Sequence, residues 1–413
     1  MNIYKFTNNV KIISGGTPNT KIKEYWNGNI PWLSIADFKD VNKYVINTDK
    51  KITSFGLKNS ATKMLNKNDI ILSARGTIGA LAILACPMAF NQSCFGLTSK
   101  DTSILLNEYI YYYLKNYIKI LKYKKEGSVF GTIDTSTFDK ILIKYPPIKE
   151  QQSIIKILSL LDYLIDIKNN INSELEQMAK TLYNYWFVQF DFPDENGRPY
   201  KSSSGKMVWN EKLKREIPEG WEVENLANNS ISSIIPVGIE YFNKKNYLET
   251  KNINNEFISD GAWISYDNRE NRANMQPQIN SIWFAKMKKS IKHITLPNNS
   301  KWFIDKYILS TGFFGIKCIY DAFSYVHCFI NSDYFEAKKN ILAHGATQKA
   351  VNNQDLERIP LIIPPTNLLK IFNSKIYNLL EIKLNIIKTN QELTSLRDFL
   401  LPLLMNGQAV IKE

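Results

Sequence analysis

The second half of this chain repeats its first half. Residues 127–185 align without a gap on residues 345–403, so that Pro146-Pro147 falls on Pro364-Pro365. A repeat of this length sets the number of structural units, and it therefore has to be recognised before any other pattern. In each copy the proline pair precedes a long apolar pattern of helical period, and prolines commonly stand at the start of a helix. The sequence predicts a unit of one globular domain and one long helix, used twice.

Each predicted helix carries an apolar seam of heptad spacing. The a/d positions of the first helix are Ile154, Ile157, Leu161, Leu164, Lys168, Ile171, Leu175, Met178, Leu182 and Tyr185, and those of the second are Phe372, Lys375, Leu379, Ile382, Ile386, Thr389, Leu393, Leu396, Leu400 and Leu403. Two such seams predict that the helices pair with each other. Antiparallel pairing is expected because the second domain can then bridge one helix end to the other, whereas parallel pairing would return the chain along the whole rod. Apolar positions off this line are expected to face another partner, and they include Ile155, Leu158, Ile165, Ile376 and Ile387.

The predicted fold class is α+β. Strands are expected at 69–73 and 79–84 and a helix at 107–125, because apolar runs there are bounded by turn residues. A segment rich in Asp, Pro, Gly and Ser at 191–224 predicts a linker. The expected domains are 1–149 (first globular domain), 150–188 (central helix), 189–366 (linker and second globular domain) and 367–413 (C-terminal helix). The two globular domains should lie at opposite ends of an antiparallel two-helix coiled coil, related by a pseudo-two-fold axis.

Composition limits the class of protein. Of the 413 residues 44% are hydrophobic and 22% are charged, which is ordinary for a soluble protein. The longest apolar stretch is too short to span a bilayer, and no apolar signal segment follows Met1. The four cysteines form no CxxC pair. We expect a cytoplasmic protein without disulfides and without a membrane partner.

The net charge of +13 is concentrated in residues 1–149. A basic domain is the electrostatic signature of a protein that binds a phosphate backbone. A solvated lysine surface in a chain rich in Lys and Asn explains the same charge. Charge alone therefore leaves both interpretations open.

Enzyme motifs are missing from the sequence. The two Pro-Pro pairs lack the flanking acidic or amide and aromatic residues with which an adenine methyltransferase holds its flipped base. No GxxxxGK[ST] or GxGxxG motif follows a predicted strand. The three histidines are scattered, and His327-Cys328 is interpreted as core packing rather than as a ligand pair. We therefore expect no catalytic residue, no metal site and no cofactor of the chain's own.

Five segments together resemble a known family. They are GGTPNT…EYWNGNIPWLS at 15–34, DIILSARGTIG at 69–79, PPIKEQ at 146–151, YWFVQFDFP at 185–193 and KMVWNEKLKREIPEGWEV at 206–223. In this order they resemble the specificity subunit of type I restriction-modification enzymes, and the resemblance covers the whole chain. Residues 231–344 depart from it, because they lack the GGTP and IPW signatures of the first domain.

The resemblance implies a division of labour between subunits. Two target recognition domains would each read one half of a split double-stranded DNA sequence, and the helices would set the half-site spacing and dock two methyltransferase (M) subunits. The M subunits would bind S-adenosylmethionine and methylate adenine at N6. Restriction (R) subunits, joined through the M subunits, would use ATP and Mg. Two alternatives remain: a self-contained DNA methyltransferase or nuclease with an unrecognised active site, and a coiled-coil scaffold that binds no nucleic acid.

Candidate DNA-binding residues of the first domain combine base-reading and phosphate-binding side chains. They are Thr17, Lys21, Lys23, Arg75, Thr77, Asn91, Gln92, Lys124 and Ser128. Arg75 stands in a glycine-containing turn and is the residue type that best reads guanine, while Asn91 and Gln92 are the types that read adenine. The alternative for Arg75 is an internal salt bridge, and for the two amides it is hydrogen bonding within a turn.

Candidates in the second domain are mainly lysines. They are Lys244, Lys245, Lys286, Lys288, Lys289, Lys292 and Gln348. The turn at 286–289 is the densest basic turn of this domain and suits a phosphate strand, although a solvated hairpin tip explains it as well. Four tryptophans, Trp26, Trp32, Trp263 and Trp302, are interpreted as core residues rather than as base-stacking platforms.

Overall fold

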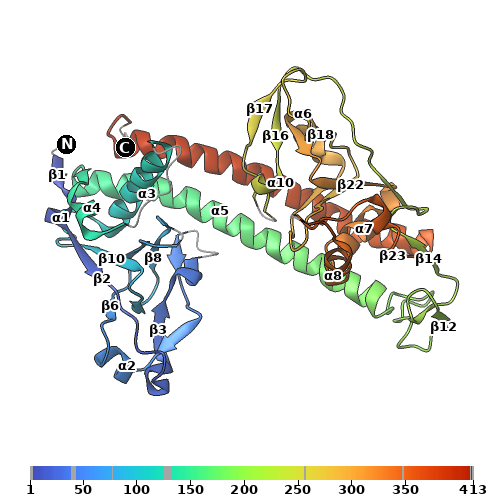
Figure 1. Ribbon diagram of the computed structural model, residues 1–413, viewed down its shortest axis with the longest axis horizontal. Coiled ribbons are helices and arrows are strands. Elements are labelled where there is room, and N and C mark those ends of the chain that lie inside the picture. The colour runs from blue at the N-terminus through green and yellow to red at the C-terminus, as the bar shows by residue number, and fades with distance from the viewer. Residues whose placement is uncertain are drawn as a thin grey trace. The chain divides into compact units, whose positions relative to one another are not determined.

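The computed structural model of the chain describes residues 3–38, 43–76, 78–124, 133–254, 257–346, 348–409 and 411. It divides into two compact units, the first made of Met1–Asp166 with Leu393–Glu413 and the second of Ile167–Glu392. Each unit mixes helix and sheet (Figure 1), which confirms the expected combination of the two. Two long helices, α5 (Ile148–Tyr183) and α10 (Thr366–Met405), contribute to both units.

The first unit contains two sheets and a helical layer. One sheet has the order β2-β10-β7-β8-β4 and the other β5-β3-β9-β6, with β1 and β11 forming a separate pair. Their bounds are β1 Ile3–Lys5, β2 Val10–Ser14, β3 Trp26–Leu33, β4 Tyr44–Val45, β5 Lys50–Ile52, β6 Lys63–Leu65, β7 Ile70–Ser73, β8 Leu81–Leu84, β9 Met88–Phe90, β10 Cys94–Ser99 and β11 Leu142–Lys144. The helices α1 (Phe6–Asn9), α2 (Ser54–Lys58), α3 (Asn107–Lys124) and α4 (Thr135–Asp139) complete the unit. The predicted strands at 69–73 and 79–84 and the helix at 107–125 are confirmed.

The second unit repeats this arrangement. Its sheets have the orders β15-β22-β19-β20 and β17-β16-β21-β18, and β14 pairs with β23. Their bounds are β14 Glu222–Asn225, β15 Ser232–Ile234, β16 Lys245–Leu248, β17 Ala262–Ile264, β18 Ala273–Met275, β19 Ser281–Ala285, β20 His293–Leu296, β21 Tyr307–Ser310, β22 Phe313–Cys318 and β23 Pro360–Ile363. The helices are α6 (Lys301–Lys306), α7 (Phe323–Ile330), α8 (Asp333–Leu342) and α9 (Asn353–Leu356).

Individual hydrogen bonds confirm the repeat. The backbone N–H of Ala74 donates to Ser93 O at 2.8 Å, and in the second unit Lys286 N–H donates to Gly312 O at 2.9 Å. The same two residues accept from equivalent partners, since Ala74 O receives Ile133 N–H at 3.2 Å and Lys286 O receives Val351 N–H at 3.1 Å. The helices α4 and α9 also begin with the same capping box, at Asp134 and Asn352. The two units therefore share a backbone framework up to the start of the long helices.

Both long helices begin where the proline pairs predict. The helix α5 starts directly after Pro147, whose carbonyl accepts the N–H of Gln151 at 3.1 Å. The helix α10 starts directly after Pro365, whose carbonyl accepts the N–H of Leu369 at 3.1 Å. A proline needs no hydrogen-bond acceptor for its nitrogen, so it terminates the preceding strand and opens the helix at no cost.

Within each unit the two helices contact each other through polar pairs. In the first unit Arg397 Nη1 lies 2.9 Å from Asp162 Oδ1. In the second unit Asn390 Nδ2 donates to Asn169 Oδ1 at 2.7 Å, and Lys383 Nζ lies 2.5 Å from Glu176 Oε2. Because the later residue of α10 faces the earlier residue of α5, the helices run antiparallel in the second unit.

The predicted seam is right at Ile154, Leu161, Phe372 and Ile386, which are buried, but at other positions of both helices it is wrong by one residue. Met178, Ile171, Ile382 and Leu396 of the predicted a/d line are exposed, and Met178 has 57% of its surface accessible. The next residue along each helix is the one that faces inward: Leu158, Ile165, Asn172 and Ala179 on α5, and Ile376, Leu380, Asn390, Leu401 and Leu404 on α10. The true seam contains Asp162, Asn169, Glu176, Lys383 and Arg397. Choosing heptad positions by their apolar side chains therefore does not find it. Consequently Ile155, Leu158, Ile165 and Ile376 are buried and need no further partner, and Ile387 packs against the core of the second unit.

The segment expected to be a linker is folded. It contains a hairpin of β12 (Met207–Asn210) and β13 (Arg215–Pro218) and the strand β14. Phe192, Ile217 and Trp221 from this segment are buried in the core of the second unit, where the rings of Phe192 and Trp221 stack 5.1 Å apart. The turn residues that suggested a linker form tight turns within this packed segment.

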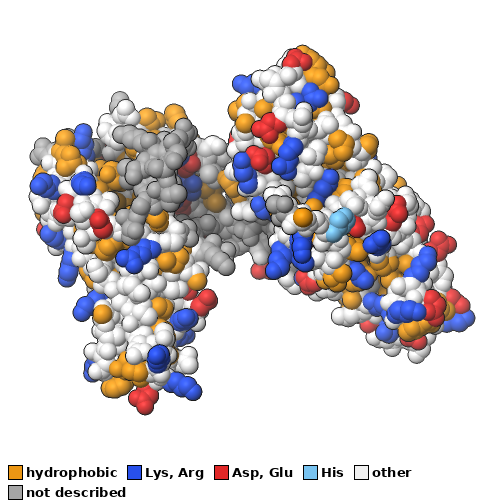
Figure 2. Space-filling view, viewed as in Figure 1, with side chains coloured by type: hydrophobic (Ala, Val, Ile, Leu, Met, Phe, Trp, Pro, Cys, Tyr) orange, Lys and Arg blue, Asp and Glu red, His pale blue; other side chains and the backbone are white. Residues whose placement is uncertain are grey.

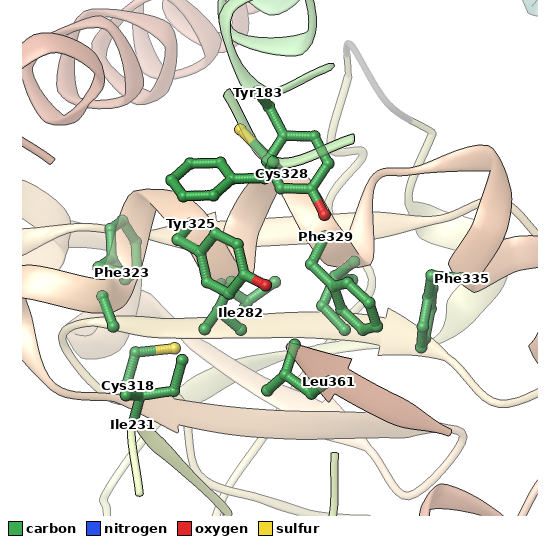
Figure 3. Packing of buried hydrophobic residues seen from close by; sticks show 14 of the residues in the cluster. Tyr183, Ile231, Ile282, Cys318, Phe323, Tyr325, Cys328, Phe329, Phe335 and Leu361 are labelled. Atoms are coloured by element: carbon green, nitrogen blue, oxygen red, sulfur yellow. The ribbon is translucent and has the colours of Figure 1, made fainter. Parts of the chain in front are cut away.

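The core of the second unit joins its sheet to α5. Tyr183 of α5 lies above Tyr325 and Cys328 of α7, while Ile282 and Cys318 come from the sheet beneath (Figure 3). Cysteines of the chain are free thiols, and Cys328 Sγ lies 3.8 Å from Ala179 O. No helix within the described ranges has the length and apolar character needed to cross a membrane.

Candidate nucleic-acid interface

In the first unit the glycine loop after β2 lies against the turn before β10. Gly16 N–H donates to Phe90 O at 3.0 Å, and Trp32 Nε1 donates to Gly16 O at 3.2 Å. A side chain on Gly15 would come within 2.2 Å of Asn91 O, so only glycine permits this approach. The loop thereby brings Thr17 to Gln92, and the Thr17 hydroxyl donates to the Gln92 side-chain oxygen.

Arg75 flanks the same turn from the other side. The preceding residue, Ala74, donates its N–H to Ser93 O at 2.8 Å, and Ser73 Oγ donates to Arg75 O at 2.9 Å. Gly76 has a φ of +70°, which allows the sharp reversal between β7 and β8. Arg75 is exposed and makes no ion pair with any residue that the structure describes, so the alternative of an internal salt bridge has no support.

The turn therefore gathers four of the predicted residues. Thr17, Arg75, Asn91 and Gln92 surround it, although Asn91 Oδ1 also accepts Ser93 N–H at 3.1 Å and so helps to hold the turn itself. Lys21 and Lys23 are exposed on the separate loop before β3. Thr77 and Ser128 lie outside the described residues, as does the side chain of Lys124 at the end of α3.

In the second unit the predicted lysines divide into free and engaged ammonium groups. Lys244, Lys288 and Lys289 are exposed, as is Gln348, and Figure 2 shows Lys and Arg side chains interspersed with Asp and Glu on the visible face of this unit. Lys245 Nζ donates to Ile304 O at 2.7 Å and Lys292 Nζ to Thr250 O at 2.6 Å. Lys286 is half-buried 4.2 Å from the centre of the Phe314 ring, and burial lowers the pKa of its ammonium group. Lys245 thus has an internal role that its sequence context did not indicate.

One of the tryptophan predictions is wrong. Trp263 is 52% exposed on the edge strand β17, with Lys244 Nζ 5.2 Å from its ring, whereas Trp32 is buried as expected. Tyr241 is also exposed and lies 5.4 Å from Tyr266, whose ring is covered by the Arg269 guanidinium at 4.0 Å. The interleaving of aromatic and basic residues between 241 and 269 is the signal that could have indicated this surface.

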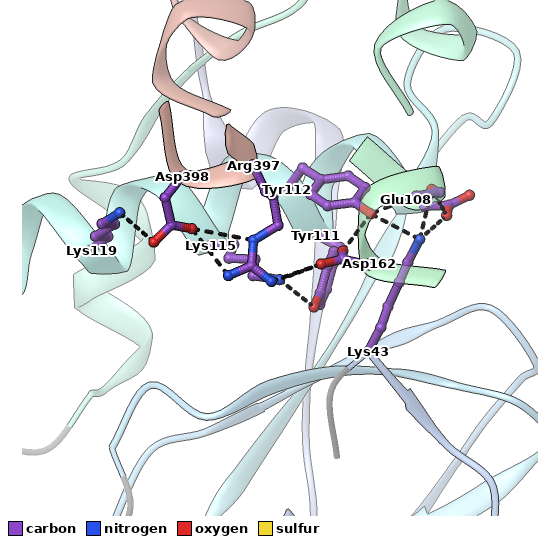
Figure 4. Close-up of polar contacts among 10 residues, drawn as sticks. Lys43, Glu108, Tyr111, Tyr112, Lys115, Lys119, Asp162, Arg397 and Asp398 are labelled. Carbon is purple, nitrogen blue, oxygen red and sulfur yellow. Dashed lines mark hydrogen bonds and ion pairs between the residues drawn. The ribbon is translucent and has the colours of Figure 1, made fainter. Parts of the chain in front are cut away.

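The acidic residues of the first unit form a structural network (Figure 4). Asp162 accepts from Tyr112 Oη at 2.7 Å and from Arg397 Nη1 at 2.9 Å, and Asp398 lies 2.9 Å from Lys119 Nζ. Burial by itself would raise the pKa of Asp162, but the charges of Lys115 and Arg397 outweigh it and lower that pKa, while burial lowers the pKa of Lys115 to about 8. These carboxylates are committed to cations and hydroxyl groups of the protein.

The histidine and cysteine side chains of the second unit support packing. His327 is buried, its Nδ1 lies 2.8 Å from Thr295 Oγ1, and burial lowers its pKa to about 3. Burial also raises the pKa of the neighbouring Cys328 thiol. This confirms the interpretation of His327-Cys328 as core residues. Within the described ranges no three His, Cys, Asp or Glu side chains are grouped in a way that could hold a metal ion.

Comparisons with known proteins agree with the repeat and the fold. Residues 5–177 match the family model described as type I restriction modification DNA specificity domain. The type I restriction enzyme MjaIX specificity subunit of Methanocaldococcus jannaschii is 29% identical, over 98% of this chain and 92% of that protein. The EcoprrI specificity subunit of Escherichia coli is 28% identical over 47% of this chain and 51% of that protein. The crystal structure of a type I restriction-modification S subunit from M. genitalium shares the fold, with a TM-score of 0.55, 15% identity and coverage of 98% of this chain and 96% of that chain. These similarities extend over nearly the whole chain and agree with its resemblance to the specificity subunits of type I restriction-modification enzymes.

Proposed function

We propose that this chain is a specificity subunit that reads a split DNA sequence, with one half-site read by each unit. The similarity to specificity subunits supports a non-catalytic role in DNA target specificity. The observation that carries the proposal is that the same turn recurs in both units with different side chains. Asn91 and Gln92 stand in the first turn, and Ser310 and Thr311 at the equivalent backbone positions of the second. One framework with two different surfaces suits two different base sequences.

The candidate residues that the structure describes form two chemical groups. One group is suited to contact base edges, and the other is suited to bind phosphates. Thr17, Arg75, Asn91, Gln92 and Gln348 would contact base edges, because their side chains offer the hydrogen-bonding patterns that distinguish base pairs. The exposed lysines, Lys21, Lys23, Lys244, Lys288 and Lys289, would hold phosphates. Lys286 and Lys292 flank the second turn and would add positive potential there. These assignments are consistent with the net charge of +13.

Partners would supply the chemistry that the chain lacks. Two M subunits would carry S-adenosylmethionine and methylate adenine, and R subunits bound through them would use ATP and Mg. The helices α5 and α10 would form the coiled coil that sets the spacing between half-sites. We expect this assembly to act in the cytoplasm.

Replacing Arg75 by Lys tests the reading role, because Lys keeps the charge but loses the bidentate geometry. We expect the R75K complex to lose discrimination at one position of one half-site, by about 1–3 kcal/mol, with the other half-site unchanged. Mapping methylated sites with the chain and its M subunits measures this. An equal loss of affinity for all sequences would make Arg75 a phosphate contact. Methyl transfer from S-adenosylmethionine to DNA by the purified chain alone would contradict the non-catalytic role.

Exposed apolar side chains on the long helices are the proposed docking surface for the M subunits. They are Leu160 and Tyr163 in the first unit, and Ile171, Met178 and Ile382 in the second. Exposed apolar groups of this kind mark protein interfaces more often than isolated surface residues do. The sequence analysis had instead expected Ile155, Leu158, Ile165, Ile376 and Ile387 to face a partner, but these residues are buried or packed against a core.

Replacing Met178 by Ser is expected to weaken M-subunit binding about 10-fold, because an interface anchor loses its apolar contact. Titration calorimetry or surface plasmon resonance with purified M subunit measures the change. The control is Ser173→Ala, an exposed residue on the same helix, which should leave the affinity unchanged. Equal affinities for M178S and the original chain would exclude this surface.

A further inference from the structure

The arginines of this chain fall into engaged and free groups. Four of them donate to acceptors of the protein: Arg198 to Asp194, Arg215 to Val188 O, Arg269 to Tyr266 O, and Arg397 to Asp162 and Asp398. The side chains of Arg75, Arg272 and Arg358 make no hydrogen bond or ion pair with any residue in the part of the chain that the structure describes. A guanidinium group that is held at the surface without a partner is available for a ligand.

Arg272 lies at the turn that is equivalent to the Arg75 turn. Its backbone carbonyl accepts the N–H of Thr311 at 2.8 Å, directly before Gly312. A Cβ atom on Gly312 would lie 3.7 Å from Arg272 Nη2 and 3.3 Å from the Thr250 methyl group, so the guanidinium extends over the space that glycine leaves open. Arg75 lies just after β7, beside the first-unit turn. Arg272 lies just before β18, beside the second-unit turn, so the two arginines approach their turns from different strands.

The backbone around Arg272 is well anchored. Besides the bond to Thr311, Ala273 N–H donates to Glu270 O at 2.9 Å, and β18 pairs with β21 from Ala273 onward. A reading side chain needs such support, because a geometry-specific contact loses its value if the backbone moves. The long side chain itself is exposed and free to meet a ligand.

The charge around Arg272 favours a polyanion, because the lysines near it outnumber the carboxylates of Glu249 and Glu270. Lys292 Nζ is fixed on Thr250 O at 2.6 Å, Lys286 donates its N–H to Gly312 O at 2.9 Å, and the exposed Lys288 and Lys289 follow in the same turn. Lys251 is balanced by Glu249 at 2.5 Å. The unbalanced lysines would hold phosphates and leave the planar guanidinium to face a base.

We propose that Arg272 is the base-reading arginine of the second unit and that it recognises a guanine in the major groove of its half-site. A guanidinium group donates two parallel hydrogen bonds to the O6 and N7 atoms of guanine, which no other base offers together. This inference rests on the proposed function and names the base that one position of the second half-site contains. The two units place their free arginines on opposite flanks of equivalent turns, so we expect their half-sites to differ.

The test is selection from a random double-stranded DNA pool by the full chain, alone and together with its M subunits. We expect Arg272→Lys to lose roughly 10- to 100-fold of the preference for guanine at one position of one half-site. The other half-site and the salt dependence of binding should stay as they are, since the positive charge is kept. The matched control is Arg358→Ala, which removes another free arginine away from the turn and should select the original motif.

Each outcome decides one of the two proposals. If the original chain enriches a split motif and R272K enriches the same motif with the same preference, Arg272 is not a reader and the proposed function stands. If Arg272→Ala weakens all sequences equally and lowers the salt slope by about one unit, Arg272 binds a phosphate and the inference is wrong. If the original chain enriches no sequence, with or without M subunits, the proposed function itself fails.

Discussion

Replacing Asp162 by Ala is expected to lower the free energy of unfolding of the first unit by about 3 kcal/mol. Asp162 has 4% of its side chain exposed, and it lies 2.9 Å from Arg397 Nη1 and 3.4 Å from Lys115 Nζ. Its loss leaves the partly buried Lys115 without its ion-pair partner and removes the acceptor of the Tyr112 hydroxyl group. The expected value lies at the lower end for a broken buried ion pair because Arg397 keeps its contact with Asp398 at 3.1 Å.

A double-mutant cycle with Arg397→Ala isolates the contact between the two long helices. The coupling energy of Asp162 and Arg397 should lie between about 0.5 and 3 kcal/mol, measured by denaturant unfolding of the full chain. A coupling energy of zero would mean that the helices of the first unit pack independently of this contact. Asp162→Asn serves as the companion variant, because it keeps the volume and removes only the charge.

The contribution of Asp162 should also depend on pH. The neighbouring cations hold its folded-state pKa below the ordinary value, so its stabilisation is complete above the unfolded-state pKa of about 3.9. It is lost as the pH falls from there through the folded-state value. The difference in stability between the original chain and D162A should therefore shrink below about pH 4. A difference that grows on acidification would contradict the direction of the pKa shift.

Replacing Trp221 by Ala is expected to lower the free energy of unfolding of the second unit by about 3–5 kcal/mol. Trp221 is 7% exposed, and its ring lies 5.1 Å from Phe192, 5.6 Å from Phe190 and 6.1 Å from Phe187. The substitution leaves a cavity in the core that joins residues 187–221 to the second unit. Thermal unfolding measures the loss, and limited proteolysis should show new cleavage between 189 and 224.

Trp209 offers the matched control, because it is a tryptophan of the same segment on β12 and is 58% exposed. Trp209→Ala should change the stability by no more than about 0.5 kcal/mol, as expected for a surface substitution. Equal effects of the two substitutions would mean that the segment behaves as the linker which its composition suggests. A large effect of W221A alone establishes it as part of the core.

Much of the framework could be predicted because its signals are local or repeated. Pro147 and Pro365 mark the helix starts through their own covalent structure, and each helix indeed begins at the next residue. The equivalence of Asp134 with Asn352 follows from the repeat, and the matching capping boxes of α4 and α9 confirm it. A pattern that occurs twice is a stronger signal than either copy alone.

The seam between the helices could not be predicted to the residue. Asn169, Glu176, Lys383 and Asn390 are acceptable inside it only because each meets a polar partner on the other helix. Which polar residues meet depends on the register of the pair, and neither helix contains that information by itself. Buried polar pairs of this kind are known to specify register and orientation in coiled coils.

The candidate interface shows the same limit. Arg75, Asn91 and Gln92 could be chosen by residue type and turn context, and the structure places them together around one turn of the first unit. The sequence analysis did not select Arg272. This residue comes close to Gly312 only because β18 pairs with β21, and the two residues are far apart in the sequence. Lys245 was chosen for its charge, but a backbone carbonyl of the protein uses its ammonium group.

The sequence by itself determined the duplicated architecture, the mixed helix and sheet content, the helix starts and the family resemblance, because these depend on residue order and local conformational preference. Only the tertiary structure decided which face of each helix is buried, that residues 191–224 belong to a core, and which basic groups remain free. Those properties are sums over contacts between distant segments, where a polar side chain is satisfied or left exposed according to what folds against it.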